Sequence, residues 1–286
     1  MTFAFMRSIG AVALIALGTS QVAAGPMMDK IRETGRFTVA TEASYPPFEF
    51  VENGQIVGYG KDILTEVMSA LSQEVGREVT LEQLDLPFQG ILPGLLAEQF
   101  DLVATSVGIN AERAARYAYT RPIAASYQTA MIRVGDAEEV TSVEDLDGKI
   151  VGTQIASASE PVVRAFDERL KSEGKDGLAD IKLFTSYPET YVALANGQID
   201  AVVQSGPALS VLMKQRPGIF ELLGPVSDTP SYLAWVVRPA DDDLRDFVNG
   251  VLADLKSSGK LTELQEKWFG FAMETPDENY LPEGAL

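Results

Sequence analysis

The sequence predicts an α/β fold of two lobes, each built on a mainly parallel sheet flanked by helices. Strand-like and helix-like runs alternate along nearly the whole chain, a pattern typical of sheets covered by helices. The alternation begins again near residue 149, so that it forms two blocks. Two extended segments, 123–133 and 230–237, flank the middle block and are predicted to carry the chain between the lobes.

The first block begins with a strand over 36–41 and continues with a helix over 61–74. A shorter helix over 91–98 then leads directly into a buried strand over 102–106. Apolar residues recur in the first helix at the spacing of one helical face. They are Ile63, Leu64, Val67, Met68 and Leu71.

The second block repeats this rhythm. Its predicted strands cover 149–154, 181–184 and 200–203, and its predicted helices cover 160–173 and 188–196. Near the end of the chain, one more amphipathic helix is indicated by the spacing of Leu244, Phe247, Val251 and Leu255.

The two extended segments define the expected domain organisation. Residues 25–128 and 232–286 are expected to form lobe 1, and residues 129–231 are expected to form lobe 2. A ligand would then lie in the cleft between the lobes, where strand ends and helix N-termini converge.

Residues 1–24 have the pattern of a cleaved signal peptide. Arg7 supplies the positive charge, residues 9–17 form a short apolar run, and Val22-Ala23-Ala24 supplies small residues before the expected cut. An uncut membrane anchor is the alternative, but the apolar run is shorter than a bilayer requires. We therefore expect an exported protein.

The composition excludes several classes of chemistry. The chain contains no cysteine and no histidine, which removes thiolate metal sites and both Cys–His and Ser–His–Asp catalysis. Carboxylate, lysine and tyrosine chemistry stays available, but an enzyme is disfavoured. The formal net charge of −18 repels nucleic acid, so we expect no nucleic-acid partner.

Arg113 is the most informative single residue. It follows a buried strand and a tight turn, and Asn110 is a good N-cap that places Arg113 in the first turn of a helix. A cation there opposes the helix dipole, whereas the same place favours a bound anion. The planar guanidinium matches a carboxylate with two parallel hydrogen bonds. The alternative is an arginine that folds back onto Glu112 or into solvent.

At this point the chain resembles a known family, the polar-amino-acid periplasmic binding proteins of ABC importers (solute-binding protein family 3). The resemblance covers the whole mature chain, and no single stretch decides it. The matching stretches are 45–50, 54–62, 87–96, 101–113, 119–122, 145–149, 195–201 and 259–270. The resemblance implies the two-lobed periplasmic-binding-protein fold, hinge closure on a small-molecule ligand, an ABC permease as partner, a monomer in the periplasm, and no cofactor.

The resemblance also assigns roles in lobe 1. It implies that Arg113 binds the α-carboxylate of the ligand, with Asn110 in place of the usual threonine of the turn. Tyr45 and Phe88 match the two aromatic walls that clamp the ligand side chain, although both positions also suit ordinary core aromatics. Ser106 lies at the strand end that binds the polar head of the ligand. Gly108 stands where a second hydroxyl is common in the family.

In lobe 2, the family places a hydroxyl and free backbone N–H groups before a helix. Here Ser157 or Ser159 supplies that hydroxyl, and the sequence leaves open which one. The clearest departure follows the strand over 200–203. The family usually has an aspartate there for the α-ammonium, and this chain has Gln204 and Ser205, with Ser205 at the aspartate position.

Glu42 is the candidate substitute for the missing aspartate. Binders of basic side chains carry an acid at this position, and opine-binding members resemble the chain both here and in lacking the aspartate. A solvated acid at the strand end is the alternative interpretation. We therefore expect a ligand with one carboxylate and a cationic or amine-bearing part: a basic amino acid, an opine-like derivative or a zwitterionic solute.

Two other functions stay open at this stage. One is a periplasmic enzyme on the same fold, similar to a cyclohexadienyl dehydratase, with Glu42 as its acid–base group. The other is a binding protein that is read by a membrane receptor instead of a permease.

Overall fold

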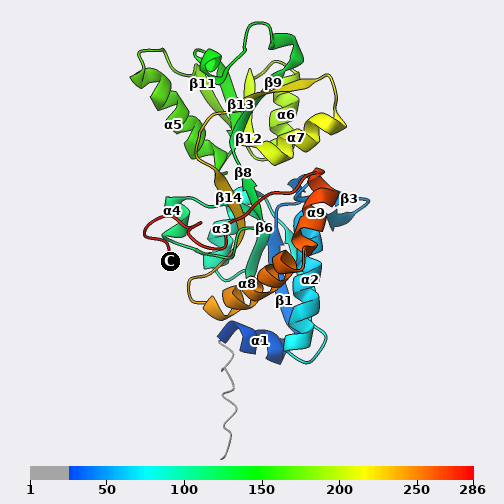
Figure 1. Ribbon diagram of the computed structural model, residues 1–286. Helices are drawn as coiled ribbons and strands as arrows, with labels where there is room; N and C mark the ends of the chain where they lie inside the picture. Colours follow the sequence, from blue (N-terminus) through cyan, green and yellow to red (C-terminus); the bar gives the residue numbers. More distant parts are fainter. Residues whose placement is uncertain (1–25) are drawn as a thin grey trace, which may run out of the picture.

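Two sheets, one in each lobe, organise the part of the chain that the computed structural model describes, residues 26–286. The predicted signal peptide, residues 1–24, lies outside these described residues. Figure 1 shows the two lobes end to end, joined by two extended segments. The lobe 1 sheet has the order β5-β1-β6-β14-β7, and β8 also pairs with β14. Its strands are β1 (Arg36–Thr41), β5 (Thr80–Asp85), β6 (Leu102–Gly108), β7 (Ala118–Tyr119), β8 (Ala124–Ser126) and β14 (Ser231–Val237).

The second sheet has the order β11-β10-β12-β9-β13. Its strands are β9 (Gln128–Arg133), β10 (Ile150–Gln154), β11 (Asp180–Phe184), β12 (Ala201–Ser205) and β13 (Phe220–Pro225). The chain enters this sheet between β8 and β9, at Tyr127, and returns to lobe 1 between β13 and β14. A small third sheet, β2 (Ser44–Tyr45), β3 (Glu49–Glu52) and β4 (Gln55–Val57), lies beside lobe 1.

Both large sheets are mixed, although the sequence predicts mainly parallel ones. β1 pairs in parallel with β5 and β6, and β10 pairs in parallel with β11 and β12. The strands next to the crossings reverse this direction, since β14 is antiparallel to β6 and β9 is antiparallel to β12. A strand that arrives from the other lobe does not follow a crossover helix, and so it is free to pair antiparallel.

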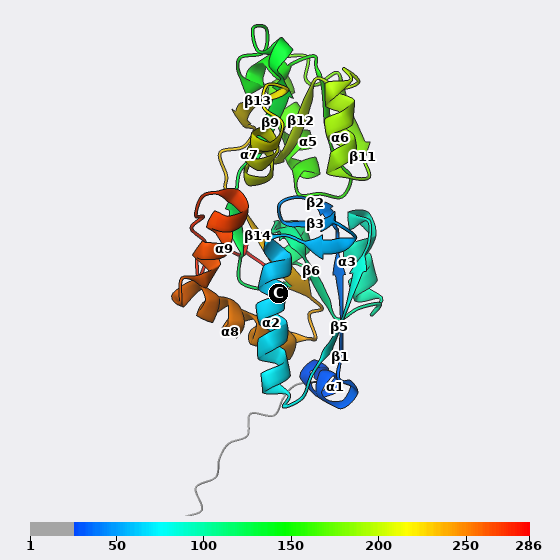
Figure 2. The same ribbon diagram turned by 90° about the vertical axis from the view of Figure 1, so that its right-hand side faces the viewer.

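Helices cover both faces of each sheet (Figures 1 and 2). In lobe 1, one face packs on α1 (Pro26–Thr34), α2 (Tyr59–Glu74), α8 (Asp242–Ser257) and α9 (Lys260–Phe269), and the other packs on α3 (Phe88–Leu96) and the short α4 (Ala111–Ala114). In lobe 2, α5 (Ser159–Ser172) covers one face, and α6 (Tyr187–Ala195) and α7 (Gly206–Gln215) cover the other. Two short 3-10 helices, Val134–Asp136 and Val143–Leu146, precede β10.

The central strands are buried because they are covered on both faces. Every residue of β6 is buried, and the apolar positions Phe37 and Val39 of β1 have no exposed surface. Parallel pairing brings the carboxyl ends of β1 and β6 to the same edge of the sheet. That edge faces lobe 2, which places the residues after Thr41 and the last residues of β6 beside the cleft.

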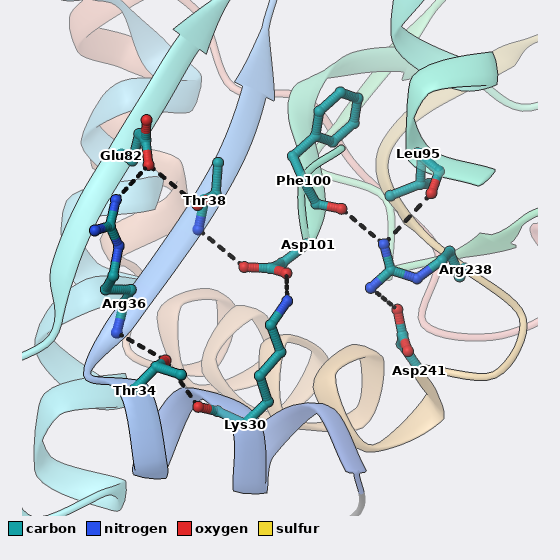
Figure 3. Close-up of polar contacts among 10 residues, drawn as sticks. All are labelled: Lys30, Thr34, Arg36, Thr38, Glu82, Leu95, Phe100, Asp101, Arg238 and Asp241. Atoms are coloured by element: carbon teal, nitrogen blue, oxygen red, sulfur yellow. Dashed lines mark hydrogen bonds and ion pairs between the residues drawn. The ribbon is translucent and has the colours of Figure 1, made fainter. Parts of the chain in front are cut away.

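Charged side chains fix the opposite end of lobe 1 (Figure 3). Asp101, just before β6, accepts a hydrogen bond from the Thr38 amide at 3.0 Å and pairs with Lys30 of α1 at 2.6 Å. Nearby, Arg238 donates to the Phe100 carbonyl at 2.7 Å and pairs with Asp241 at 2.6 Å. Each buried charge in this region therefore has a partner of opposite sign.

Membrane insertion finds no support in the described helices. Between residues 26 and 286, none combines the length and the apolar character that a bilayer crossing requires.

Candidate functional site

The two lobes meet around a small enclosed cavity at the carboxyl ends of β1 and β6. Eight of the ten residues that the sequence suggests line it, all except Arg113 and Gln204. The lining residues are Glu42, Tyr45, Phe88, Ser106, Gly108, Gln128, Gln154, Ser157, Ala158, Ser159, Tyr187, Ser205 and Leu233. They come from both lobes and from the crossing strand β9, as a site for a ligand between lobes requires.

The cavity has a volume of about 20 Å³, room for about one water molecule. Contacts across the cleft hold the lobes this close. The Arg113 guanidinium reaches the Ala156 carbonyl, and the Gln154 amide donates to Glu42. A Cβ atom added at Gly108 would overlap Ala158 of the opposite lobe. An amino-acid-sized solute therefore needs a separation of the lobes before it can enter.

Arg113 lies next to the cavity and is buried, with only 9% of its surface exposed. The Asn110 side chain accepts from its backbone amide at 2.9 Å, the N-cap that the sequence predicts. The guanidinium donates to the Gly108 carbonyl at 2.9 Å and to Ala156, and its carbon lies 5.6 Å from the centre of the Phe88 ring. Within residues 26–286 it forms no ion pair, with Glu112 or with any other acid. A buried guanidinium without an acid is a strong anion site.

Glu42 follows β1 and is the one acidic residue among those that line the cavity. It is 4% exposed, and its carboxylate accepts from the Ser44 hydroxyl at 3.2 Å and from the Gln154 amide. Burial raises the pKa of Glu42 to about 7, with a smaller contribution from the charge of Asp85. Glu42 is thus not a solvated strand-end acid, and it favours a cation that replaces the Gln154 contact.

The aromatic walls are arranged differently from a simple pair of facing rings. Tyr45 stacks on Tyr187 of α6, across the cleft, with ring centres 5.6 Å apart, and on Phe48 at 4.9 Å. Phe88 begins α3 and lies under the Arg113 guanidinium. Burial raises the pKa of both tyrosines, so their hydroxyl groups stay neutral.

Ser157 and Ser159 lie at the start of α5, whose N-terminus faces the cavity. The Ser159 hydroxyl is occupied inside the site, because it donates to Gln128 Oε1 at 2.5 Å and lies 3.0 Å from the Tyr187 hydroxyl. Ser157 Oγ accepts from the Ser159 amide at 3.2 Å and also lies close enough to the Tyr187 hydroxyl to lower the pKa of that group. Of the two hydroxyls, Ser159 therefore has the closer side-chain partners within the site.

Gln204 and Ser205 point to opposite sides of β12, as successive residues of a strand do. Ser205 lines the cavity and accepts from the Ser126 hydroxyl at 3.0 Å. Gln204 has no exposed surface and does not line the cavity, and its amide oxygen accepts from the Tyr191 hydroxyl. The structure thus brings Ser205, but not Gln204, to the other predicted residues.

Four polar residues join the site without having been singled out from the sequence. Gln154, at the end of β10, could have been found from its strand-end position alone. Gln128 lines the cavity from the crossing strand β9, and Tyr187 lines it from the start of α6, positions that only the folded chain reveals. Glu49 lies behind Ser106, which donates to it, and does not itself line the cavity. Among the described residues, no group of three or more acidic side chains is placed to hold a metal ion.

Comparison with known proteins identifies the family to which the chain belongs. The profile of bacterial extracellular solute-binding proteins, family 3, matches residues 37–271. The L-cystine-binding protein TcyJ of Escherichia coli (strain K12) is 28% identical over 268 residues, which cover 93% of this chain and 94% of that protein. The putative ABC transporter arginine-binding protein 2 of the same organism is 29% identical over 241 residues, 83% of this chain and 91% of that protein.

Solved structures with the same fold include relatives of both binding and catalytic lineages. A mutant of ArgBP from T. maritima superposes with a TM-score of 0.72 at 30% identity and covers 85% of this chain and 99% of its own. The ancestral amino-acid-binding protein AncCDT-1, described as a precursor of cyclohexadienyl dehydratase, has a TM-score of 0.70 at 26% identity and covers 85% and 98%.

Proposed function

The chain belongs to the bacterial extracellular solute-binding proteins of family 3, and on that premise we propose that it is the periplasmic solute-binding component of an ABC importer. Its ligand is an amino acid or amino-acid derivative that carries one carboxylate and a cationic or amine group. The protein acts as a monomer, is exported by cleavage of residues 1–24, and delivers its ligand to a permease in the inner membrane.

The unpaired Arg113 is the observation that carries this proposal. Two backbone carbonyls orient its guanidinium, yet none of the described residues neutralises its charge. Leaving such a charge buried is unfavourable unless a partner arrives. A ligand carboxylate supplies that partner, with the amides at the start of α5 and the Ser157 hydroxyl on its other side.

The cationic end of the ligand is assigned to Glu42 and the aromatic rings. Glu42 reaches the cavity with a pKa near neutral, so a nearby cation lowers this pKa and gains an ionised partner. Tyr45 and Tyr187 offer ring faces from opposite lobes, which favour a flat or cationic group. The relative named for arginine supports a ligand of this class, whereas L-cystine, for which the other relative is named, carries two carboxylates and two amines.

Binding then proceeds by hinge closure. The ligand first meets Tyr45, Phe88, Ser106 and Arg113 on lobe 1 while the cleft is open. Lobe 2 swings in on the two crossing segments and adds the start of α5 and Ser205. Closure is favoured because Arg113 then contacts both the ligand and, through the Ala156 carbonyl, the second lobe.

An enzyme on the same fold is the alternative, favoured by one observation. A carboxylic acid with a pKa of about 7 in a closed cleft has the properties of a general acid–base group, and AncCDT-1 is a precursor of a dehydratase. Incubation separates the two functions, because binding returns the solute unchanged and catalysis yields a new product.

A thermal-shift screen of the mature protein tests the proposal. The panel contains basic amino acids, L-cystine, opines and betaine-like solutes, with wild type and Arg113→Ala tested in parallel. We expect a carboxylate-bearing compound to raise the melting temperature of wild type but not of the variant. Equal stabilisation of both proteins by every active compound would contradict the role of Arg113.

A further inference from the structure

Glu49 is a buried acid that the proposed binding mechanism leaves unused. It has no exposed surface and no Lys or Arg partner in the described part of the chain. Its carboxylate accepts three hydrogen bonds from β6, from Thr105 Oγ1 at 2.9 Å, from the Ser106 amide at 3.3 Å and from Ser106 Oγ at 3.1 Å. All three donors are neutral, so the strand turns its polar groups toward an acid that lies just behind the cavity wall.

The fold makes room for this acid. Glu49 lies against the first turn of α2, where a Cβ atom added at Gly60 would overlap Glu49 Oε1. Any residue other than glycine there would displace the carboxyl group. The N-terminus of a 16-residue helix also favours a negative charge, which partly offsets the cost of burying it.

The hydrogen bonds of Glu49 determine how Ser106 meets a ligand. A serine hydroxyl carries one proton and two lone pairs. When Glu49 is ionised, the Ser106 proton points to its carboxylate, and only the lone pairs of Oγ remain for the cavity that Ser106 lines. Ser106 therefore presents an acceptor, with a carboxylate directly behind it, to any group that enters.

This acceptor lies beside the expected carboxylate position. Ser106 and Gly108 are two residues apart on β6 and both line the cavity. The Gly108 carbonyl holds the Arg113 guanidinium. A ligand whose carboxylate pairs with Arg113 thus places its next atoms over Ser106.

We propose that Glu49, acting through the Ser106 hydroxyl, selects ligands that carry a protonated amine next to the carboxylate bound by Arg113. Glu49 is then a positioning residue that supplies the negative charge which Ser205 lacks. The inference rests on the proposed function and assigns the amine to Ser106, while Glu42 keeps the distal cationic group.

Protonation of Glu49 reverses the polarity of this contact. Burial raises the pKa of Glu49 to about 8, and Glu42, Tyr45 and Tyr59 are the titratable groups that face it. A protonated Glu49 donates to Ser106, which frees the serine proton to point into the cavity. The preference for the ligand with the amine therefore increases as the pH rises from 6 to 8, because the titration of Glu42 affects both members of a matched pair alike.

Matched ligands test the inference by isothermal titration calorimetry. The probes are L-arginine with δ-guanidinovaleric acid, and L-lysine with ε-aminocaproic acid, in which the second member of each pair lacks only the α-amine. For a bound pair we expect wild type at pH 8 to favour the amine by about 30-fold, the ratio of a buried charged contact. Glu49→Gln should reduce this ratio to less than about threefold and abolish its increase between pH 6 and 8.

Two further variants separate positioning from folding. Ser106→Ala removes the acceptor and leaves Glu49 in place, so it should lose the amine preference as Glu49→Gln does. Thr105→Val is the matched control, because it removes a neighbouring hydrogen bond to Glu49 without turning the Ser106 proton, and it should retain the preference. Circular dichroism melts verify the fold of each variant, and Ser106→Ala decides the result if Glu49→Gln does not fold.

The outcomes distinguish the inference from the function on which it rests. Loss of the amine preference in Glu49→Gln and Ser106→Ala supports the inference. Retention of that preference in both variants, while Arg113→Ala loses all four probes, overturns the inference and leaves the proposed function standing. If wild type binds none of the four probes, the same comparison is made with the active compound of the thermal-shift screen and its deaminated analogue, and an equal affinity for these two overturns the inference.

Discussion

Two arginines of lobe 1, the buried Arg113 and the partly buried Arg238, have similar surroundings but differ in one partner. Each donates to two backbone carbonyls, Arg113 to Gly108 and Ala156 and Arg238 to Leu95 and Phe100. Arg238 also pairs with Asp241 at 2.6 Å (Figure 3). Arg113 has no such acid among residues 26–286.

This difference separates an arginine that stabilises the fold from one that awaits a ligand. All partners of Arg238 belong to lobe 1, so its ion pair is complete as soon as that lobe has folded. The two acceptors of Arg113 belong to different lobes, and its charge stays uncompensated even when the lobes meet. The missing acid therefore marks the place where the chemistry of the ligand completes the site.

The largest expected effect is a loss of stability on removal of Asp241, the acidic partner of Arg238 that has no counterpart at Arg113. Asp241→Ala leaves the partly buried Arg238 without its acid and should lower the free energy of unfolding by about 3 kcal/mol, the lower end of the range for a buried pair. Urea denaturation measures this loss. The ligand affinity of the folded variant should stay within about threefold of wild type, since Arg238 lies at the far end of lobe 1. A stability change below about 1 kcal/mol would remove the contrast between the two arginines.

Arg113→Ala should reverse this pattern. Affinity for a carboxylate ligand should fall by about 2 kcal/mol or more, because the ligand loses a buried charged partner. The free energy of unfolding should stay unchanged or rise, because the substitution removes a charge that has no acid in the described chain. Calorimetry and urea denaturation on the same preparation give both numbers. A large loss of stability with unchanged ligand affinity would instead show that Arg113 stabilises the fold, as Arg238 does, and does not bind the ligand.

Gly108 offers a further test, because it contacts both Arg113 and the opposite lobe. A methyl group at this position overlaps Ala158, so Gly108→Ala should hold the lobes apart and weaken binding by about 1–2 kcal/mol. Small-angle scattering with saturating ligand should show a more extended molecule than wild type. A variant that closes fully would show that the two lobes tolerate this overlap.

Glu42→Gln should have the smallest effect. It should weaken the binding of a cationic ligand by about 1 kcal/mol and leave the binding of a purely anionic ligand unchanged. Its pH dependence has a defined sign. The pKa of Glu42 is raised from 4.5 to about 7, so its contribution to stability is complete below pH 4.5 and is lost as the pH rises through 7. In thermal melts, the stability of Glu42→Gln should therefore decrease less than that of wild type between pH 4.5 and about 7. Identical pH profiles would place Glu42 in solvent.

The parts of this account that the sequence predicts are those governed by local pattern. The strand over Arg36–Thr41 is predicted with the bounds that the structure has, and the helices that follow it begin or end within a few residues. Asn110 caps α4 as its side chain suggests, and Ser106 lies at the cleft because it ends a buried strand. Periodicity and capping chemistry are sufficient for these features.

The remaining features depend on contacts between distant segments. Glu49 lies between two aromatic residues in a short strand, a place typical of an exposed acid, and only β6 and Gly60 explain its burial. Tyr187 reaches the site because α6 begins at the cleft. The mixed direction of both sheets follows from the lobe crossings, which leave no periodic signal.

Titration calorimetry of wild type and Arg113→Ala with two compounds tests directly whether Arg113 binds the carboxylate of the ligand. The compounds are the tightest carboxylate ligand from the screen and its carboxamide, which keeps the shape and removes the charge. The account predicts that amidation weakens binding to wild type by about 2 kcal/mol or more and leaves the weak binding to Arg113→Ala unchanged. An equal penalty in both proteins would contradict it, because the carboxylate would then be recognised elsewhere.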